Sequence, residues 1–414
     1  MIAMSIRSPG GDSTWTATAK SCREASQMQN EEELRKELLA EIESIAPVVA
    51  EQAAVSESLG RLSEPTMAAL RSTRLLQFFA PQELGGLEAD PVTLVLVLEA
   101  LARVDASTSW TIGIIGGTSR IAGAYLPAAT TRRLFAGGVP PMAGTVLPKG
   151  VAEPVPGGYR VKGRWPYGSG IYHADWVAAG AIIPGMPLPA GARLVLLPRN
   201  QVVVHDNWQV AGLRGSGSSD YSIEDQFVSE EMTFSLLDFI AGSAVTGGPT
   251  SRLGRPSIVT SFHIGIALGI ARRALDEIST QAVEKGRGFP PSPLPTQPHV
   301  QFALGKAEIE LASARAYGLQ IIGALYQDSV GRRVPPPARQ AEARAAGTYI
   351  TEVAQRVTMT AFQAAGGTAL FDTNWLQRCF RDIAAAGQHF MVSQSAYRAV
   401  GQFKLNQPDA NPML

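Results

Sequence analysis

Residues 157–176, GGYRVKGRWPYGSGIYHADW, place a short β-type run directly before a turn crowded with aromatic residues and glycines. GGYRVKGRW is typical of a strand, and PYGSG is typical of a turn. Four further β-type runs follow before residue 235: DWVAAGAII, ARLVLLP, VVVHDNW and DYSIEDQFV. Short strands at nearly regular spacing predict a small β-barrel or sandwich, which we expect over residues 139–235.

Helical patterns flank this β-region on both sides. Apolar residues recur at three- and four-residue spacing in EEELRKELLAEIESIAPVVAEQAA and in DPVTLVLVLEALARVDASTSWTIGII, which predicts an N-terminal helical domain over residues 31–138. Long helical patterns return from about Arg255, separated by proline-rich connectors, and predict an antiparallel four-helix bundle within residues 236–414. The expected fold class is α+β, in the order helices, β-domain, helical bundle.

The composition limits the possible partners. The chain has 414 residues, of which 45% are hydrophobic, so a sizeable buried core is expected. Lysines plus arginines number 36, and aspartates plus glutamates also number 36. Because no net charge results, no field attracts nucleic acid or an anionic membrane, and neither partner is expected.

The N-terminal segment and the cysteines bear on the compartment. Residues 1–30 are rich in serine, threonine, glutamine and glycine and lack the apolar region of a signal peptide, which predicts a disordered leader. Cys22 and Cys379 fit neither a zinc spacing nor a disulfide framework, which favours a cytoplasmic location. The apolar run over residues 256–271 carries serines, a threonine and His263, and it predicts a buried helix rather than a membrane span.

Five motifs occur in the order and the predicted domains of one family: PQELGG (81–86), GGYRVKGRWPYGSG (157–170), GLRGSGS (212–218), QAAGG (363–367) and RCFRD (378–382). Together they resemble the acyl-CoA dehydrogenase superfamily. The resemblance implies a flavin between the β-domain and the C-terminal bundle. It also implies a homotetramer in which a neighbouring subunit helps to close the site.

The branch of this superfamily depends on one carboxylate. Acyl-CoA dehydrogenases use a glutamate as base, whereas the related two-component (group D) monooxygenases take reduced FMN or FAD from a separate NAD(P)H:flavin reductase. These monooxygenases bind O₂ and oxygenate their substrates through a flavin hydroperoxide. The dehydrogenase glutamate usually follows the RD pair by about eight residues, where this chain has His389 and Phe390. The alternative position, between Asp238 and Asp276, holds no acidic residue either.

Two residues are the catalytic candidates. His389 lies where the oxygenase branch carries a functional histidine, which could act as acid or base near neutral pH; the alternative is a buried, structural histidine. Ser169 matches the Ser or Thr that reaches flavin N5 in the family, although a serine in a glycine-rich turn would explain GSG equally. Trp165 and Tyr167 beside it are expected to form apolar walls that exclude water from the flavin.

The resemblance assigns further residues to flavin binding. GLRGSGS would hold the flavin by backbone N–H groups and hydroxyls, with Ser216 and Ser218 as donors and Arg214 beside a phosphate. QAAGG would contribute Gln363, Gly366 and Gly367, often to the adjacent subunit; a plain helix C-cap is the alternative.

The substrate side of the site has weaker candidates. Trp110 in DASTSW would lie along the flavin or substrate cavity, with a core tryptophan as the alternative. His173 either faces the site or caps the next strand, and Phe390 would lie beside the substrate. His205, His263 and His299 have no clustered partners, so that no metal site is expected.

No phosphate-binding GxGxxG fingerprint follows a predicted strand, so that this chain is not expected to bind NAD(P)H itself. The expected function is therefore the oxygenase component of a two-component flavin monooxygenase that hydroxylates a small aromatic, heteroaromatic or amine substrate. The alternatives are an acyl-CoA dehydrogenase-type FAD desaturase with a relocated base, and a non-catalytic binding subunit.

Overall fold

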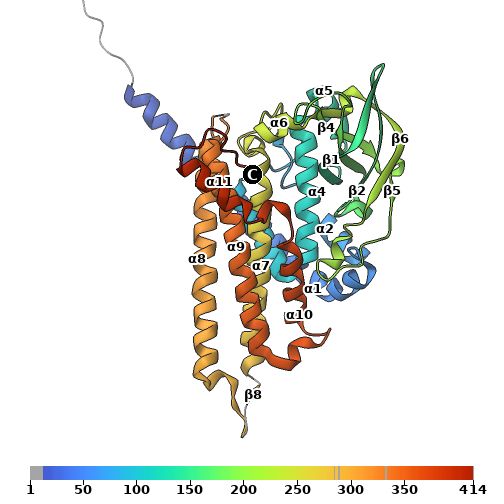
Figure 1. Cartoon of the computed structure of the whole chain (residues 1–414). Helices are drawn as coiled ribbons and strands as arrows, with labels where there is room; N and C mark the ends of the chain where they lie inside the picture. The colour runs from blue at the N-terminus through green and yellow to red at the C-terminus, as the bar shows by residue number, and fades with distance from the viewer. Residues whose placement is uncertain (1–12, 284, 288–289, 332, 414) are drawn as a thin grey trace, which may run out of the picture.

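The computed structural model describes residues 13–283, 285–287, 290–331 and 333–413. N-terminal helices, a central sheet and C-terminal helices follow one another along the chain, which confirms the predicted fold class (Figure 1). The N-terminal helices are α1 (Ser13–Leu59), α2 (Glu64–Arg71), α3 (Pro91–Val104), α4 (Ala106–Tyr125) and α5 (Ala128–Leu134).

The prediction of a disordered leader over residues 1–30 is wrong from Ser13 onwards, because helix α1 begins there. Residues 1–12 lie outside the described part of the chain. Between Ser13 and Pro47 the sequence contains neither glycine nor proline, so nothing interrupts the helical hydrogen bonds. The polar composition that suggested disorder thus belongs in part to a helix, on which residues 28–30 are exposed.

One aspartate sets the junction between α3 and α4. Asp105 ends α3, and its buried carboxylate then accepts the backbone N–H of Thr108 over 2.7 Å as the N-cap of α4. The cap satisfies a helix-terminal N–H that would otherwise be buried without a partner. It also fixes the start of α4, and with it the place of Trp110 in the following turn.

Seven strands of the described chain form one sheet in the order β5-β6-β2-β1-β3-β4-β7. Each of the five predicted runs contains a strand, whereas the first and last strands were not predicted. The first strand pairs in parallel with β3, and its register shifts at Pro148, so it lacks the regular pattern that sequence reasoning seeks. The strands are β1 (Met142–Val155), β2 (Gly158–Trp165), β3 (Trp176–Ile182), β4 (Ala192–Pro198), β5 (Val203–Val204), β6 (Tyr221–Ser229) and β7 (Thr233–Ser235).

The sheet curls around a core of its own. Trp165 on β2 and Tyr221 on β6 stack with ring centroids 5.5 Å apart, and both reach across to carbonyls of β3. Trp165 is 0% exposed, and its indole N–H donates to the Gly180 carbonyl over 2.7 Å. The prediction that Trp165 forms a wall of the flavin site is therefore wrong, since its ring fills the interior of the β-domain.

The C-terminal region contains α6 (Leu236–Ala241), α7 (Gly254–Val283), α8 (Pro298–Ser329), α9 (Pro337–Ala365), α10 (Trp375–Ala386) and α11 (Ser395–Lys404). The long helices α7, α8 and α9 run side by side (Figure 1). The fourth helical segment is divided into α10 and α11. Helix α10 ends at Gly387, where a side chain would collide with the Gln355 amide of α9. This break carries His389.

Helix α7 is the central helix of the molecule. Gly265 and Gly269 let the backbone of α3 approach it closely, because a side chain at either position would collide with carbonyls of α3. By length and composition Pro256–Val283 could span a membrane, but 83% of its most apolar window is buried inside the protein. This burial is that of a core helix, as the sequence predicted.

Candidate active site

A row of polar side chains joins helix α4 to the β-domain. The indole N–H of Trp110 donates to Ser169 Oγ over 3.1 Å. The Ser169 hydroxyl lies 2.6 Å from Ser218 Oγ, which in turn lies 2.7 Å from Ser216 Oγ. Four residues that the sequence assigned to the site from three separate motifs are thus in direct contact.

The segment that carries Ser216 and Ser218 has an unusual backbone. Leu213 and Gly217 both adopt left-handed conformations, with φ of 53° and 58°. The Ser216 carbonyl accepts the backbone N–H of Gly170 over 2.9 Å, which ties this loop to the turn after β2. A loop with such consecutive turns directs hydroxyls and amides to one side, as a loop that binds a ligand does.

Helix α10 anchors the same loop. The buried carboxylate of Asp382 accepts the backbone N–H of Leu213 over 2.6 Å, and Arg381 donates to the Ala211 carbonyl over 2.7 Å. A side chain at Gly212 would collide with the Arg381 carbonyl. The RD pair, whose contacts the sequence does not show, therefore fixes residues 211–213 against the helical bundle.

A glutamate of α1 completes this anchor. Glu57 pairs with Arg381 at 2.5 Å, with Arg378 at 3.0 Å and with Arg214 at 3.7 Å. Burial raises the pKa of Glu57, but the three arginines outweigh burial and hold its pKa below the ordinary value. Arg214, predicted beside a flavin phosphate, is half exposed and thus lies at the edge of the loop.

Two histidines lie on the other side of Trp110. The His389 ring centroid is 6.1 Å from that of Trp110 and 5.0 Å from that of Phe390. His263 of α7 packs between them, 5.3 Å from Trp110 and 4.5 Å from His389. Sequence reasoning set His263 aside as an isolated histidine, because its partners are 153 and 126 positions away along the chain.

His389 caps a turn and does not lie within a helix. It is the N-cap of the short 3₁₀ helix η9 (Phe390–Val392), and its Nδ1 accepts the backbone N–H of Met391 over 3.3 Å. A ring nitrogen that accepts a hydrogen bond carries no proton, so neutral His389 is protonated at Nε2. The buried guanidinium of Arg344 on α9 holds this turn by donating to the Phe390 and Met391 carbonyls, each over 3.3 Å.

Among the described residues, the cluster contains no carboxylate that could act as a base. Burial lowers the pKa of His263 well below the ordinary value, and His389 is the titratable neighbour that lowers it further. Asp382, the nearest acidic residue before His389 in sequence, directs its carboxylate to the Leu213 N–H. Within the described residues, the cluster thus consists of aromatic and imidazole rings and hydroxyls, without a carboxylate.

Comparison with known proteins agrees with this geometry. Residues 26–132 match the acyl-CoA dehydrogenase N-terminal domain, and residues 261–394 match its C-terminal domain. The indole-3-acetate monooxygenase of Pseudomonas putida is 31% identical over 82% of this chain and 86% of its own length. The chain belongs to the acyl-CoA dehydrogenase superfamily, in its reduced-flavin-dependent monooxygenase branch.

Two further comparisons cover nearly the full length of both this chain and the compared proteins. The oxygenase subunit HsaA of Mycobacterium tuberculosis is 26% identical, with 91% of this chain and 97% of HsaA covered. The structure of XiaF from Streptomyces sp. has the same fold, with a TM-score of 0.87 and 24% identity over 94% of this chain and 99% of XiaF. The protein is therefore a flavin-dependent monooxygenase that uses reduced flavin and O₂, as the sequence predicted.

The donor set of the cluster fits a flavin. An isoalloxazine ring is planar and carries polar nitrogen and carbonyl groups along one edge, and Ser216, Ser218 and Ser169 present hydroxyls that lie in contact with one another. Tyr167 stands beside this row with a left-handed backbone, φ 65°, and is 61% exposed. A large ring held so openly next to Ser169 offers a surface on which a planar ligand can stack.

His173 does not join the cluster. It lies in the 3₁₀ turn η2 (Ile171–His173), and burial together with the charge of Arg71 lowers its pKa to about 4. The charged groups that act on it are Arg71, Glu64 and Arg61, and its buried Nε2 has no hydrogen-bond partner within the described residues. Whether His173 faces the site or caps the next strand stays a prediction.

The QAAGG residues also lie apart from the cluster within one chain. Gln363 is an exposed residue near the end of α9, and Gly366 and Gly367 begin the 3₁₀ turn η8 (Gly366–Leu370). Thr368, which follows them, accepts a hydrogen bond from Lys285 beyond the end of α7. His263 lies about 30 Å back along the same helix, at a rise of about 1.5 Å per residue. Within one chain, QAAGG therefore lies at the opposite end of α7 from the cluster, and its assignment to flavin binding stays a prediction.

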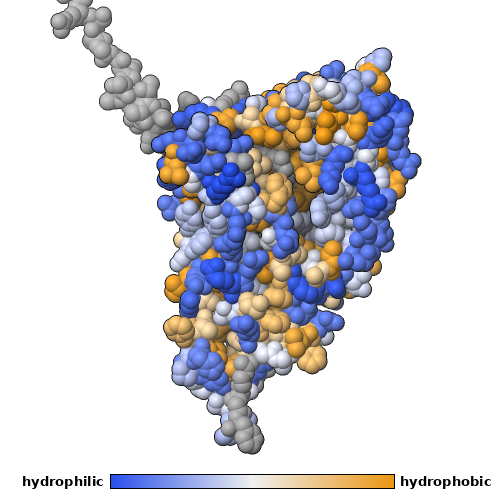
Figure 2. Space-filling model, viewed as in Figure 1, coloured by the Kyte–Doolittle hydropathy of each residue, from blue (hydrophilic) through white to orange (hydrophobic). Residues whose placement is uncertain are grey.

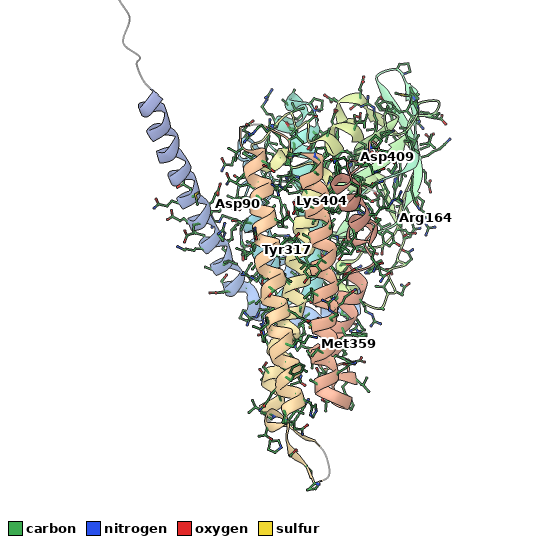
Figure 3. All side chains as sticks on the ribbon, turned by 60° about the vertical axis from the view of Figure 1, so that its left-hand side comes forward. Asp90, Arg164, Tyr317, Met359, Lys404 and Asp409 are labelled. Atoms are coloured by element: carbon green, nitrogen blue, oxygen red, sulfur yellow. The ribbon has the colours of Figure 1, made fainter. Side chains whose placement is uncertain are left out.

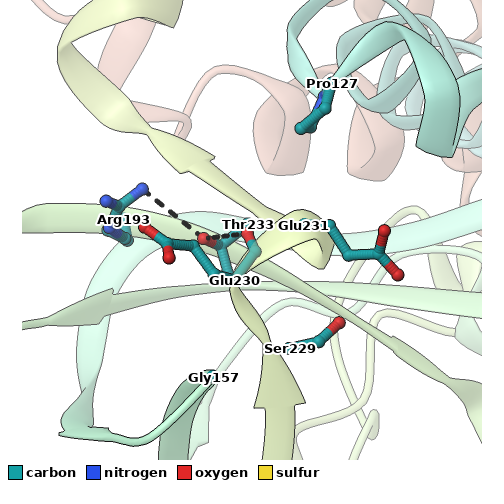
Figure 4. Close-up of a pocket in the computed structure, with 7 residues that line it drawn as sticks. All are labelled: Pro127, Gly157, Arg193, Ser229, Glu230, Glu231 and Thr233. Atoms are coloured by element: carbon teal, nitrogen blue, oxygen red, sulfur yellow. Dashed lines mark hydrogen bonds between the residues drawn. The ribbon is translucent and has the colours of Figure 1, made fainter.

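An open groove of the described surface lies apart from this site. It has a volume of about 670 Å³ and lies at the β7 edge of the sheet, lined by Pro127, Gly157, Arg193, Ser229, Glu230, Glu231 and Thr233 (Figure 4). Arg193 donates to Thr233 Oγ1 over 3.4 Å, and Glu231 points away from it in the close-up. The groove shares no residue with the cluster around Trp110.

Proposed function

We propose that this monooxygenase oxygenates a small aromatic or heteroaromatic substrate, or an amine, held against Trp110, His263 and His389. The observation that carries the proposal is a cluster of aromatic and imidazole rings beside the Ser169 hydroxyl, which includes no carboxylate among the described residues. Names of the relatives support an aromatic substrate, since they include indole-3-acetate monooxygenase and, in a Rhizobium species, a resorcinol hydroxylase.

Bound reduced flavin would supply the electrons that activate O₂, and O₂ would supply the oxygen atom. Ser169 Oγ accepts a hydrogen bond from Trp110 and keeps a second lone pair, so it can also accept from the N5–H of reduced flavin, and we assign its flavin contact to N5. Ser216 and Ser218 would hold the same ring edge, and Tyr167 would stack on its face. Flavin as either FMN or FAD is compatible with these contacts.

His389 is assigned the acid role. Its Nε2 carries the proton in the neutral ring, because Nδ1 accepts the Met391 N–H. A protonated nitrogen at the border of the Trp110 ring can donate to the oxygen that is being transferred or to the hydroxyl that forms. For Nε2 to act as a base, the proton would have to move to Nδ1, and His389 would then lose the hydrogen bond from the Met391 N–H.

The proposal includes partners outside this chain. Some relatives are named as oxygenase subunits or components, which implies a separate reductase, and we assign it an NAD(P)H:flavin reductase. We propose a homotetramer, since α8 and α9 expose apolar side chains such as Phe302, Ile309 and Tyr349 on their outer faces. Tyr317 and Met359 lie along the same two helices (Figure 3). In the view of Figure 2, hydrophilic and hydrophobic residues are interspersed over most of the surface.

The tetramer would also bring QAAGG of one subunit to the flavin of the next. A cytoplasmic location is part of the proposal, because the reductase draws on NAD(P)H and Cys379 is a free, buried thiol.

Anaerobic mixing with reduced flavin tests the proposal. The flavin-free protein should bind FMNH₂ or FADH₂, and admission of O₂ should then give a transient species that absorbs to the blue of oxidised flavin. With ¹⁸O₂ and indole, indole-3-acetate or resorcinol as substrate, mass spectrometry should detect one labelled oxygen in a product. Absence of both signals, or a yellow protein that bleaches with an acyl-CoA, would contradict the proposal and favour a dehydrogenase.

A further inference from the structure

His263 is a polar side chain in the core of the cluster without a protein partner. It is 5% exposed, and within the described residues neither ring nitrogen makes a hydrogen bond. Its contacts are ring contacts, with Trp110 on α4 and with His389 after α10. Most buried polar groups have a hydrogen-bond partner, so an unpartnered one at a ligand site indicates a contact that the ligand supplies.

The position of His263 is fixed from all sides. Its neighbour Phe262 packs edge-on against Phe79, and a side chain at Gly117 of α4 would collide with the Phe262 ring. Helix α7 is held at the next turn by the close approach of Gly265 to α3. The part of α7 that carries His263 is therefore held in place, and its imidazole ring lies against the rings of Trp110 and His389.

The two histidines offer different hydrogen-bond chemistry. Neutral His389 has its proton on Nε2 and can only donate from that nitrogen. His263 is desolvated and lies 4.5 Å from His389, which disfavours a positive charge on it. A neutral imidazole keeps one nitrogen as an acceptor. Within one aromatic cluster, neutral His389 thus offers a hydrogen-bond donor, and neutral His263 offers an acceptor.

We propose that His263 is a substrate-binding residue whose imidazole accepts a hydrogen bond from the hydroxyl or ring N–H of the aromatic substrate. The inference rests on the proposed function and narrows it: the substrate is an aromatic ring that bears a hydrogen-bond donor. With this donor on His263, the ring lies against Trp110, and the carbon to be oxygenated is directed to the flavin beside Ser169. No proton leaves the substrate in this contact, because a desolvated imidazole is a weak base.

Calorimetric titration of the flavin-free protein with indole and indene tests this inference without any turnover. The two ligands have the same shape, but a CH₂ group in indene replaces the N–H of indole. The wild-type protein should bind indole about tenfold more tightly, as one buried hydrogen bond implies. In His263→Phe the preference should disappear, and in His263→Gln, whose amide keeps an acceptor, part of it should return.

His173→Phe is the matched control, since it replaces another largely buried histidine that lies outside the cluster, and it should keep the wild-type preference. Equal affinities of the wild-type protein for indole and indene, including no measurable binding of either, would overturn the inference. A preference that persists in His263→Phe would overturn it as well. A protein that oxygenates indole and indene equally well would retain the proposed function while losing the role of His263, so the two failures are distinguishable.

Discussion

The indole N–H of Trp110 and the hydroxyl of Ser169 form a hydrogen bond of 3.1 Å that joins the N-terminal helices to the β-domain. The bond uses one lone pair of the serine oxygen and leaves its O–H and its other lone pair for further partners. Ser218 lies within reach at 2.6 Å, and the proposed flavin N5 competes with it. In the proposed function, Trp110 is therefore a positioning residue for Ser169 and also packs against the substrate.

Replacement of Trp110 by Phe should uncouple the reaction. Phe keeps a ring against His263 but removes the donor to Ser169, so the hydroxyl turns away from the flavin in part of the molecules. We expect several-fold more hydrogen peroxide per reduced flavin oxidised, measured with peroxidase-linked detection, at a stability loss of about 1 kcal/mol.

Trp165→Phe is the control for this change. It removes the buried hydrogen bond to Gly180 in the β-core and should lower the free energy of unfolding by about 1–3 kcal/mol. Coupling should stay at the wild-type level below the unfolding transition. Equal peroxide release by the two variants would show that the Trp110–Ser169 bond has no part in catalysis.

The two roles of His389 can be separated by substitution. His389→Asn keeps a side chain that caps η9, whereas His389→Ala removes both the cap and the imidazole. Both variants should lose product formation by tenfold or more relative to peroxide release. The free energy of unfolding should fall by about 1 kcal/mol in the alanine variant alone. Wild-type coupling in His389→Asn would mean that the residue acts only as a cap.

Sequence reasoning found those parts of the molecule that depend on local pattern. Strands β2, β3, β4 and β6 lie within predicted runs, and Ser169, Ser216 and Ser218 were assigned from motifs that the structure brings into contact. Strand β1 was missed because its bulge at Pro148 breaks the pattern of residues that marks a strand. This strand forms by pairing with β2 and β3. The residues of β3 are far from it along the chain, so a short stretch of sequence does not reveal the pairing.

The misassigned residues share one cause. Trp165 and Tyr167 lie two positions apart, yet one fills the β-core and the other is largely exposed, because the left-handed backbone at Tyr167 reverses the direction of the chain. His263 and His173 were weighed without their neighbours, and only the packing of α7 on α4 distinguishes them. Which side of a helix or strand is buried depends on the packing of elements that are far apart in the sequence.

Glu57→Gln should weaken the anchor of the 211–218 loop. The change leaves the guanidinium groups of Arg378 and Arg381 without their common carboxylate, which should lower the free energy of unfolding at pH 7 by about 2 kcal/mol. Because the pKa of Glu57 is lowered in the folded protein, its stabilising effect exists above the ordinary value of 4.5 and is lost as the pH falls toward the folded pKa.

The difference between wild type and Glu57→Gln, measured by urea unfolding, should therefore shrink below about pH 4.5. The affinity for reduced flavin should fall several-fold at pH 7, where the loop is loosened. Glu64→Gln, which alters a surface ion pair with Arg71, is the control and should change stability by less than about 1 kcal/mol. A pH-independent difference would contradict a role for the Glu57 charge.

Asp382→Asn should have the opposite dependence on pH. Burial raises the pKa of Asp382 to about 7, although the Leu213 N–H opposes this rise. The folded protein therefore keeps a proton that the unfolded chain releases near the ordinary value of 3.8, so stability falls as the pH rises from about 4 to about 7. Asparagine removes this titration and still offers an oxygen to Leu213.

The melting temperature of Asp382→Asn should consequently exceed that of the wild type at pH 8 and converge with it toward pH 4, with a difference in stability on the order of 1–4 kcal/mol at the upper end. Flavin affinity should stay within about threefold, because one hydrogen bond to the loop is kept. Asp382→Leu, which has no acceptor for the Leu213 N–H, should lose flavin affinity at every pH. If Asp382→Asn were instead less stable than the wild type at pH 8, the buried carboxylate would be stabilising as an anion, and the loop would be held by its charge rather than by its hydrogen bond.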